Sequence, residues 1–198
     1  MNAFATKVVL ITGGSKGIGL ACARQFVEQG ARVVISSRSQ ANIDQALSEL
    51  PGAQGFAADL SDDTAAANLV RQVEEQVGPI DVLISSAGAA KRSPPEDLTP
   101  AFWRAAMDAK FFSTINVVDP VIKLMARRGR GVIVNVVAHE DYRDLSGFEN
   151  AASMVTGFTQ SWARELTPFN IRVGGVVPAI TAQECDDELH WAEINDEL

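Results

Sequence analysis

The first segment whose residue types and spacing point to chemistry is a glycine-rich run, Thr12-Gly13-Gly14-Ser15-Lys16-Gly17-Ile18-Gly19. Glycines in such a turn permit a tight bend, let the backbone approach a pyrophosphate and let the following helix pack closely on the preceding strand. The N-terminus of that helix would offer unpaired N–H groups and a partial positive charge to the phosphates. A turn of this kind can also be purely structural, but its place after an apolar run favours dinucleotide binding.

The residues that end the second apolar run indicate which dinucleotide would bind. Dinucleotide-binding domains usually place an acid here to hold the ribose hydroxyls of NAD, or an arginine to accommodate the 2′-phosphate of NADP. This chain has Ser36-Ser37-Arg38 and no acid, and Lys16 supplies a second cation from the glycine turn. The sequence therefore predicts NADP(H) rather than NAD(H), with Ser37, Arg38 and Lys16 near the phosphate. The alternative is that Arg38 is only a solvated residue at a strand end.

These residues need a scaffold, and the chain predicts one by alternating short β-branched runs with longer helical patterns. The predicted strands are 7–12, 32–36, 53–57, 80–85, 131–137 and 171–177, and the predicted helices are 17–28, 40–50, 62–77, 100–127 and 150–166. Nearly continuous apolar strands that alternate with helices are typical of a parallel sheet covered on both faces. We expect one doubly wound, Rossmann-like α/β domain of about six strands over residues 1–181, and an acidic tail over 182–198.

Further short segments give the chain a family resemblance over residues 6–181. Besides the glycine turn they are Asp59-Leu60, Ser85-Ser86-Ala87-Gly88, Trp103, Ile133-Val134-Asn135, Arg164-Glu165-Leu166 and Ile171-Arg172-Val173. The chain resembles the short-chain dehydrogenase/reductase family. The resemblance implies an oxidoreductase with a nicotinamide cofactor, in which Asp59 and Leu60 lie near the adenine and Ser86, Ala87 and Gly88 also border the cofactor. Serines 85 and 86 replace two asparagines of the family pattern.

The catalytic positions of that family are occupied by other residue types here. Counting from the flanking motifs places Phe148 at the tyrosine position, Ala152 at the lysine position, Ala138 at the serine position and Lys110 at the asparagine position. In the family the tyrosine exchanges a proton with the substrate, and the lysine lowers its pKa. Neither Phe148 nor Ala152 can do this. The resemblance therefore implies a divergent member that lacks the usual Ser-Tyr-Lys set.

Three residues are candidate substitutes for the missing acid. His139 and Tyr142 follow the fifth predicted strand, in a loop that should border the nicotinamide end of the crevice. His139 can titrate near neutral pH, Tyr142 is an alternative acid, and Lys110 would serve if its ammonium pointed inward. The alternative is a solvated polar loop and a charge on the helix surface.

Three functions remain open at this point. The first is an NADP(H)-dependent oxidoreductase on a carbonyl or alcohol substrate with replaced catalytic residues. The second is a non-catalytic NADP(H)-binding sensor or a subunit paired with an active partner. The third is a non-redox enzyme that reuses the crevice. The substrate itself is not indicated.

Composition narrows the classes of partner. The 198 residues carry a net charge of −8, but seven of the 25 acids lie in residues 184–198, which leaves 18 acids against 17 bases elsewhere. A nearly neutral body with an acidic tail argues against binding to nucleic acid or an anionic membrane. Two distant cysteines, Cys22 and Cys185, indicate neither a disulfide framework nor a metal site. With no apolar leader or membrane-spanning run in the sequence, we expect a cytoplasmic protein.

The end of the sequence predicts a shortened sheet. About twenty residues follow Pro178, so the last strand of the family pattern is expected to be missing. His190, Trp191 and Ile194 would form an apolar stripe on a short acidic helix, and the alternative is a frayed tail. The helices predicted over 100–127 and 150–166 carry surplus apolar residues, which favours a homodimer through them.

Overall fold

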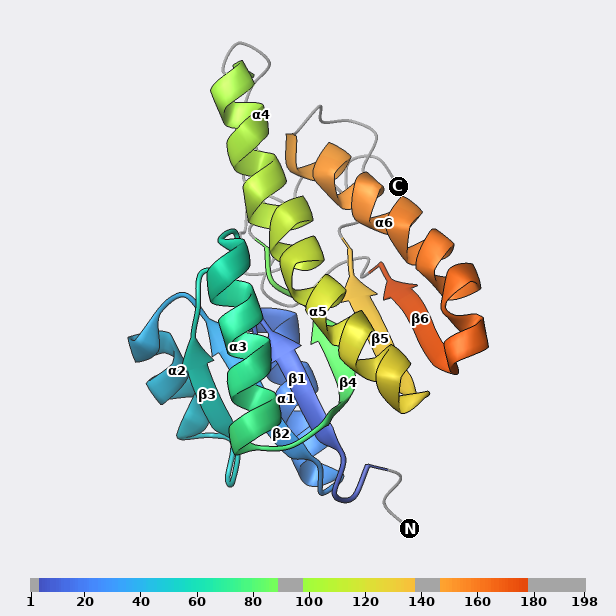
Figure 1. Ribbon diagram of the computed structural model, residues 1–198. Coiled ribbons are helices and arrows are strands. Elements are labelled where there is room, and N and C mark those ends of the chain that lie inside the picture. The colour runs from blue at the N-terminus through green and yellow to red at the C-terminus, as the bar shows by residue number, and fades with distance from the viewer. Residues whose placement is uncertain (1–3, 89–97, 138–146, 178–198) are drawn as a thin grey trace, which may run out of the picture.

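A parallel sheet of six strands forms the centre of the computed structural model, which describes residues 4–88, 98–137 and 147–177, and of 147–150 the backbone only (Figure 1). The strand order is β3-β2-β1-β4-β5-β6, and every neighbouring pair is parallel. The strands are β1 (Val8–Thr12), β2 (Arg32–Ser37), β3 (Gln54–Ala57), β4 (Ile80–Ser85), β5 (Gly131–Val136) and β6 (Ile171–Val176). The doubly wound fold expected from the sequence is confirmed, and a strand beyond β6 would fall outside the described residues.

Helices cover both faces of this sheet (Figure 1). They are α1 (Gly17–Glu28), α2 (Gln40–Leu47), α3 (Asp63–Gln76), α4 (Pro100–Ala106), a π-helical segment (Met107–Phe112), α5 (Ser113–Arg128), α6 (Gly147–Glu165) and a 3-10 turn (Thr167–Phe169). Side chains cap several N-termini: the Asp62 carboxylate accepts from the Ala65 N–H and the Thr99 hydroxyl from the Phe102 N–H. The expected bounds hold to within a few residues. The helix predicted over 100–127 is present as one uninterrupted helical stretch from Pro100 to Arg128, in which the π-helical segment Met107–Phe112 separates α4 from α5.

Two apolar layers hold the sheet between its helices. Val8, Leu10 and Leu83 face α3 and α5, while Val9 and Ile11 face α1 and α2, and all are at most 2% exposed. Since adjacent residues of a strand point to opposite faces, β1 is buried throughout and its sequence is continuously apolar. Full burial of each such side chain contributes about 1.5–3 kcal/mol. The packing of these layers fixes the positions of the carboxyl ends of the strands, where the polar residues of the predicted site lie.

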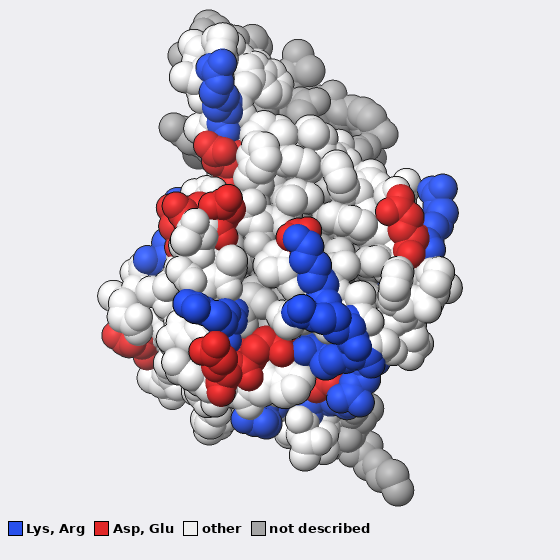
Figure 2. Space-filling model, viewed as in Figure 1, with Lys and Arg blue, Asp and Glu red and all other residues white. Residues whose placement is uncertain are grey.

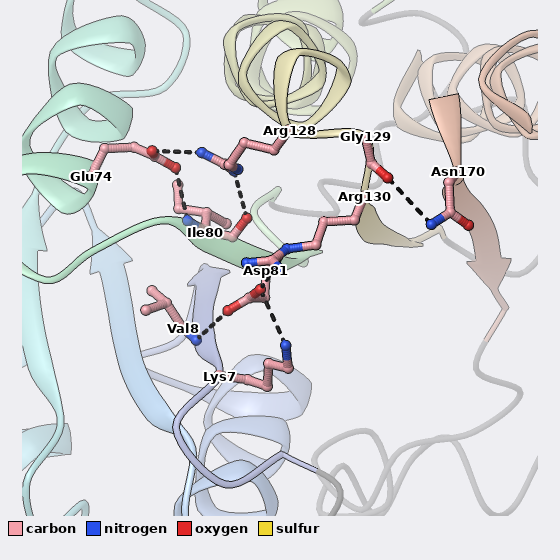
Figure 3. A network of polar contacts seen from close by, with 9 residues as sticks. All are labelled: Lys7, Val8, Glu74, Ile80, Asp81, Arg128, Gly129, Arg130 and Asn170. Carbon is pink, nitrogen blue, oxygen red and sulfur yellow. Dashed lines mark hydrogen bonds and ion pairs between the residues drawn. The ribbon is translucent and has the colours of Figure 1, made fainter. Parts of the chain in front are cut away.

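Polar side chains connect the amino ends of the strands, at the edge of the sheet opposite the glycine turn (Figure 3). The Asp81 carboxylate accepts from the Val8 N–H at 3.2 Å and pairs with the ammonium of Lys7 at 3.5 Å. The Glu74 carboxylate accepts from the Ile80 N–H and pairs with Arg128, both at 2.7 Å. On the face shown in Figure 2, basic side chains gather over the lower end of α5 with acidic ones beside them. No described helix has the length and apolar content needed to cross a membrane.

Candidate functional site

The glycine turn joins β1 to α1 at the carboxyl edge of the sheet, and its glycines are required by close backbone contacts. Gly13 has φ +66°, and a Cβ there would lie 2.8 Å from the Ser86 carbonyl oxygen. A Cβ on Gly14 would lie 2.6 Å from Ile35, and one on Gly19 would overlap the backbone of Gly13. The turn therefore brings bare backbone to the edge where α1 begins.

The N-terminus of α1 has the form that binds anions. Lys16 is the N-cap residue, its extended backbone leads directly into the helix, and no side chain caps the first turn. Lys16 and Gly17 are exposed, Ile18 is half-buried and Ser15 is 9% exposed. The first N–H groups of a helix have no partner within the helix, so this end can donate to phosphate oxygens.

Thr12 fixes the segment after β4 against the glycine turn. Its buried Oγ1 accepts from the N–H groups of Ser86 and Ala87, each at 3.1 Å. Ser86 and Ala87 are half-buried and Gly88 is exposed, so the structure brings this predicted cofactor segment alongside the turn. Ser85 differs, since it is 1% exposed and lies within the sheet.

The residues predicted to hold the adenosine half lie at the ends of β2 and β3. Ser37 is half-buried, Arg38 and Asp59 are exposed, and Leu60 is 5% exposed. The pKa of Asp59 is lowered, first by hydrogen bonds from the Ser61 hydroxyl and N–H and to a smaller extent by the charge of Arg38. Asp59 therefore stays a carboxylate at neutral pH.

Lys110 is the unusual residue of this edge. It lies in the π-helical segment with 4% exposure, and its Nζ donates to the Val136 carbonyl at 2.6 Å and to the Ala87 carbonyl at 3.3 Å. Burial lowers the pKa of this ammonium from 10.5 to about 8. The alternative that Lys110 is a charge on the helix surface was wrong, because its side chain turns inward to the ends of β4 and β5.

The π-helical turn accounts for that inward direction. A π turn inserts one residue into the helical repeat. Here the Ser113 hydroxyl donates to the Ala109 carbonyl at 2.9 Å, and the Thr114 hydroxyl donates to the Lys110 carbonyl at 2.9 Å. Phe112, two residues after Lys110, is 42% exposed.

Gly88 makes room for the Lys110 side chain. Its φ is +143°, which L-residues rarely adopt, and a Cβ there would lie 2.8 Å from Cδ of Lys110. The lysine and the segment after β4 are thus packed against each other.

A row of buried polar residues crosses the sheet just below this edge, and sequence reasoning missed it. The strand registers place Ser36, Thr12, Ser85 and Asn135 side by side. Asn135 Nδ2 donates to the Thr159 hydroxyl of α6 at 2.8 Å, while Ser36 Oγ, Ser85 Oγ and Asn135 Oδ1 have no partner within the described residues. Each of these four polar residues lies near the carboxyl end of a mostly apolar strand. That position in the sequence could have predicted the row.

The structure describes only some of the remaining candidate residues. Ala152, at the position of the family lysine, is 3% exposed in α6. Ala138, His139 and Tyr142 lie outside the described residues, as does the side chain of Phe148. Within the described ranges, no group of three or more His, Cys, Asp or Glu side chains is arranged to hold a metal ion.

Comparisons with known proteins agree with one another. The family model described as short chain dehydrogenase matches residues 7–193. A 3alpha-hydroxysteroid dehydrogenase from Mediterraneibacter gnavus is 35% identical over 88% of this chain and 74% of the relative. A 3-oxoacyl-(acyl-carrier-protein) reductase from Thermotoga maritima is 30% identical over 92% and 77%. A variant actinorhodin polyketide ketoreductase, solved with NADPH, has a TM-score of 0.86 and 28% identity over 96% and 77%.

Proposed function

This chain belongs to the short-chain dehydrogenase/reductase family, and we propose that it is an NADP(H)-dependent oxidoreductase of a carbonyl or alcohol substrate in which Lys110 exchanges the proton. One observation carries the proposal: a buried ammonium with a pKa of about 8 lies at the carboxyl ends of β4 and β5. Ligands of doubly wound sheets bind at this edge. A group whose pKa is near the working pH is suited to general acid–base catalysis.

The residues around the glycine turn fit a dinucleotide phosphate. Side chains at Gly13 or Gly19 would collide with neighbouring backbone, so the turn has the bare surface that a pyrophosphate needs. The exposed cations of Lys16 and Arg38 would hold the 2′-phosphate, since β2 ends without an acid that would repel it. When bound, the nicotinamide would supply hydride chemistry. The polyketide ketoreductase solved with NADPH supports this choice of cofactor.

Lys110 would act through one remaining N–H. An ammonium has three donors, and two are directed to the carbonyls of Ala87 and Val136. These two bonds hold Nζ in place and leave the third proton for a substrate oxygen. His139 and Tyr142, which follow β5 closely in the sequence, are further candidates for the same role.

The function is tested by separating cofactor binding from turnover. We expect NADPH to bind the wild type and Lys110→Met equally in calorimetric titrations, while the variant reduces a panel of ketones and aldehydes at least about 100-fold more slowly, as loss of a general acid predicts. The matched control is Lys123→Met, whose ammonium pairs with Asp119 on the exposed face of α5. Equal turnover by Lys110→Met would remove Lys110 from the mechanism.

A second candidate is a non-catalytic NADP(H)-binding protein. The observation that favours it is Ala152, which is buried and carries no ammonium at the position of the family lysine. Micromolar NADPH binding without turnover of any substrate in the panel would select this function. Absence of binding to both NADPH and NADH would contradict both candidates.

The exposed apolar side chains of two helices support a homodimer. Phe112, Met154 and Phe158 are each 42% exposed, and the Phe158 ring contacts Phe111 and Trp162. Large exposed apolar groups that gather on one face mark association surfaces. We expect light scattering to give a dimer that Phe158→Glu converts to a monomer.

A cytoplasmic location is part of the same proposal. Cys22 is a free thiol, which suits the reducing cytoplasm, and cell fractionation would test this location.

A further inference from the structure

Lys110 has a second chemical capacity, because a buried lysine with a lowered pKa is a nucleophile as well as an acid. Of the four lysines within the described residues, only Lys110 is buried, at 4% exposure, and this burial lowers its pKa to about 8. At pH 7.5 this pKa leaves roughly a quarter of the molecules with a neutral amine, whereas the ordinary value of 10.5 would leave about one in a thousand.

The surroundings of Nζ supply no negative charge that would hold its proton. Lys123 pairs with the Asp119 carboxylate at 2.6 Å, but no carboxylate within the described ranges pairs with Lys110. Its partners are the backbone carbonyls of Ala87 and Val136. Carbonyl dipoles stabilise an ammonium less than an ion pair does, so the neutral amine is more accessible at Lys110 than at an ion-paired lysine.

The same two hydrogen bonds fix the direction of the nucleophilic electron pair. A neutral amine nitrogen carries two N–H bonds and one lone pair besides its bond to Cε. The Val136 carbonyl at 2.6 Å and the Ala87 carbonyl at 3.3 Å can accept both N–H bonds. The lone pair then occupies the remaining direction, in which the ammonium carries its third proton.

The amine lies directly beneath an exposed piece of backbone. A Cβ added to Gly88 would lie 2.8 Å from Cδ and 3.6 Å from Nζ of Lys110, and Gly88 itself is exposed. These groups lie at the carboxyl ends of β4 and β5, the edge at which ligands of doubly wound sheets bind. A small molecule at this edge can therefore approach Nζ without displacing a side chain at position 88.

We propose that the neutral amine of Lys110 adds to aldehydes and small ketones and forms an imine with them at the carboxyl ends of β4 and β5. Nζ attacks the carbonyl carbon, the electron pair of the C=O bond moves to oxygen, and this oxygen leaves as water with the two protons of the amine. The step needs no oxidant or reductant, and water reverses it. When protonated, the imine keeps one N–H, which the Val136 carbonyl can accept.

This inference rests on the proposed function in one respect, that carbonyl compounds bind at this edge. It adds a covalent capture of these compounds that requires no cofactor.

Reductive trapping on the full chain tests the imine. Wild-type protein without cofactor is incubated at pH 7.5 with propanal and sodium cyanoborohydride, which reduces an imine to a stable propyl-lysine, and peptide mass spectrometry locates the adduct. The adduct at Lys110 is expected to form at least about 10-fold faster than at Lys123, the exposed control lysine. In urea above the unfolding transition the two lysines should react at equal rates, because the fold supplies the reactivity.

Two glycine variants keep the lysine and change its setting. Gly88→Ala introduces the 2.8 Å contact with Cδ and should reduce the trapping rate at Lys110 toward that at Lys123. The matched control is Gly157→Ala in α6, whose Cβ meets open space and which should preserve the rate. Trapping at Lys110 no faster than at Lys123 in the folded wild type, or a preference that persists in urea, would overturn the inference.

The outcome is separable from that of the proposed function. Fast trapping at Lys110, together with equal ketone turnover by Lys110→Met, would support the imine and contradict the proton transfer. Slow trapping, together with turnover lost in Lys110→Met, would overturn the imine and support the proton transfer.

Discussion

At the scale of single residues, the charge of Lys110 links the site to the stability of the fold. Its ammonium is held by the carbonyls of Ala87 and Val136, but burial still lowers its pKa from 10.5 to about 8. Below pH 8 both the folded and the unfolded chain carry the proton, and the folded state bears the cost of a buried charge. Between pH 8 and 10.5 only the unfolded chain binds the proton, so folding gains stability as the pH rises.

This linkage predicts a pH-dependent difference between the wild type and Lys110→Met. One pKa unit corresponds to about 1.4 kcal/mol, so the free energy of unfolding of the wild type relative to the variant should rise by roughly 2 kcal/mol from pH 7.5 to pH 10. Urea unfolding at the two pH values measures it, and Lys123→Met is the control that should show no such rise. A constant difference would mean that Lys110 keeps an ordinary pKa.

Arg38 carries the prediction of cofactor choice. A charge-assisted contact to phosphate contributes about 1.5–3 kcal/mol, so Arg38→Ala should weaken NADPH binding about 10- to 100-fold and leave NADH binding unchanged. Calorimetric titration with both cofactors measures the two affinities. Arg71→Ala, on the exposed side of α3, should change neither. Equal losses for NADPH and NADH would place Arg38 away from the 2′-phosphate.

At the scale of elements, the site depends on a π-helical turn packed against a glycine. The segment Met107–Phe112 turns Lys110 inward, and Gly88 leaves the space that its side chain fills. The hydroxyls of Ser113 and Thr114 donate to the Ala109 and Lys110 carbonyls of this segment. The lysine is thus placed jointly by a helix irregularity and by the segment after β4.

Gly88→Ala should therefore displace Lys110. The new Cβ would meet Cδ of Lys110 at 2.8 Å in a strained backbone conformation, and we expect a loss of about 1–3 kcal/mol in unfolding free energy together with reduced turnover. The change should cost less in a Lys110→Ala background, because alanine has no δ atom for the new Cβ to meet and the effects of residues in contact are not additive. The control Gly157→Ala meets open space in α6 and should preserve both properties. Additive losses would show that Gly88 acts without Lys110.

At the scale of the whole molecule, the carboxyl ends and the amino ends of the strands carry different kinds of polar residues. The carboxyl edge carries the glycine turn and Lys110, while the amino edge is tied by Asp81 and Glu74 (Figure 3). Arg128 pairs with Glu74 and also donates to the Ile80 carbonyl, so the end of α5 is joined to α3 and β4. Stability is thereby supplied away from the residues that would touch ligands.

Glu74→Ala should destabilise the fold and leave NADPH binding unchanged. The variant loses a partly buried ion pair and leaves the Ile80 N–H without its acceptor, which together cost about 1–3 kcal/mol. Chemical denaturation measures the loss. Asp119→Ala removes an exposed ion pair with Lys123 on α5 and should cost less than about 0.5 kcal/mol. Similar costs for the two variants would show that the amino edge has no special role.

Much of the fold follows from local sequence. The apolar runs of β1 and β4 require burial on both faces. Asp62 caps the N-terminus of α3, and Thr99 caps the N-terminus of α4. The glycines of the turn could be predicted because backbone approach there tolerates no side chain. The π-helical turn could not, because hydrophobic periodicity over 100–127 fits a regular helix and the insertion depends on tertiary packing.

The sequence by itself determined the order of the strands and helices, the family and the glycine-rich turn after β1, since each depends on residue types within a short stretch. Only the tertiary structure decided that Lys110 is buried and that Ser36, Thr12, Ser85 and Asn135 form one polar row. The physical reason is that the direction of a helical side chain and the register of distant strands are set by packing between segments far apart in the chain.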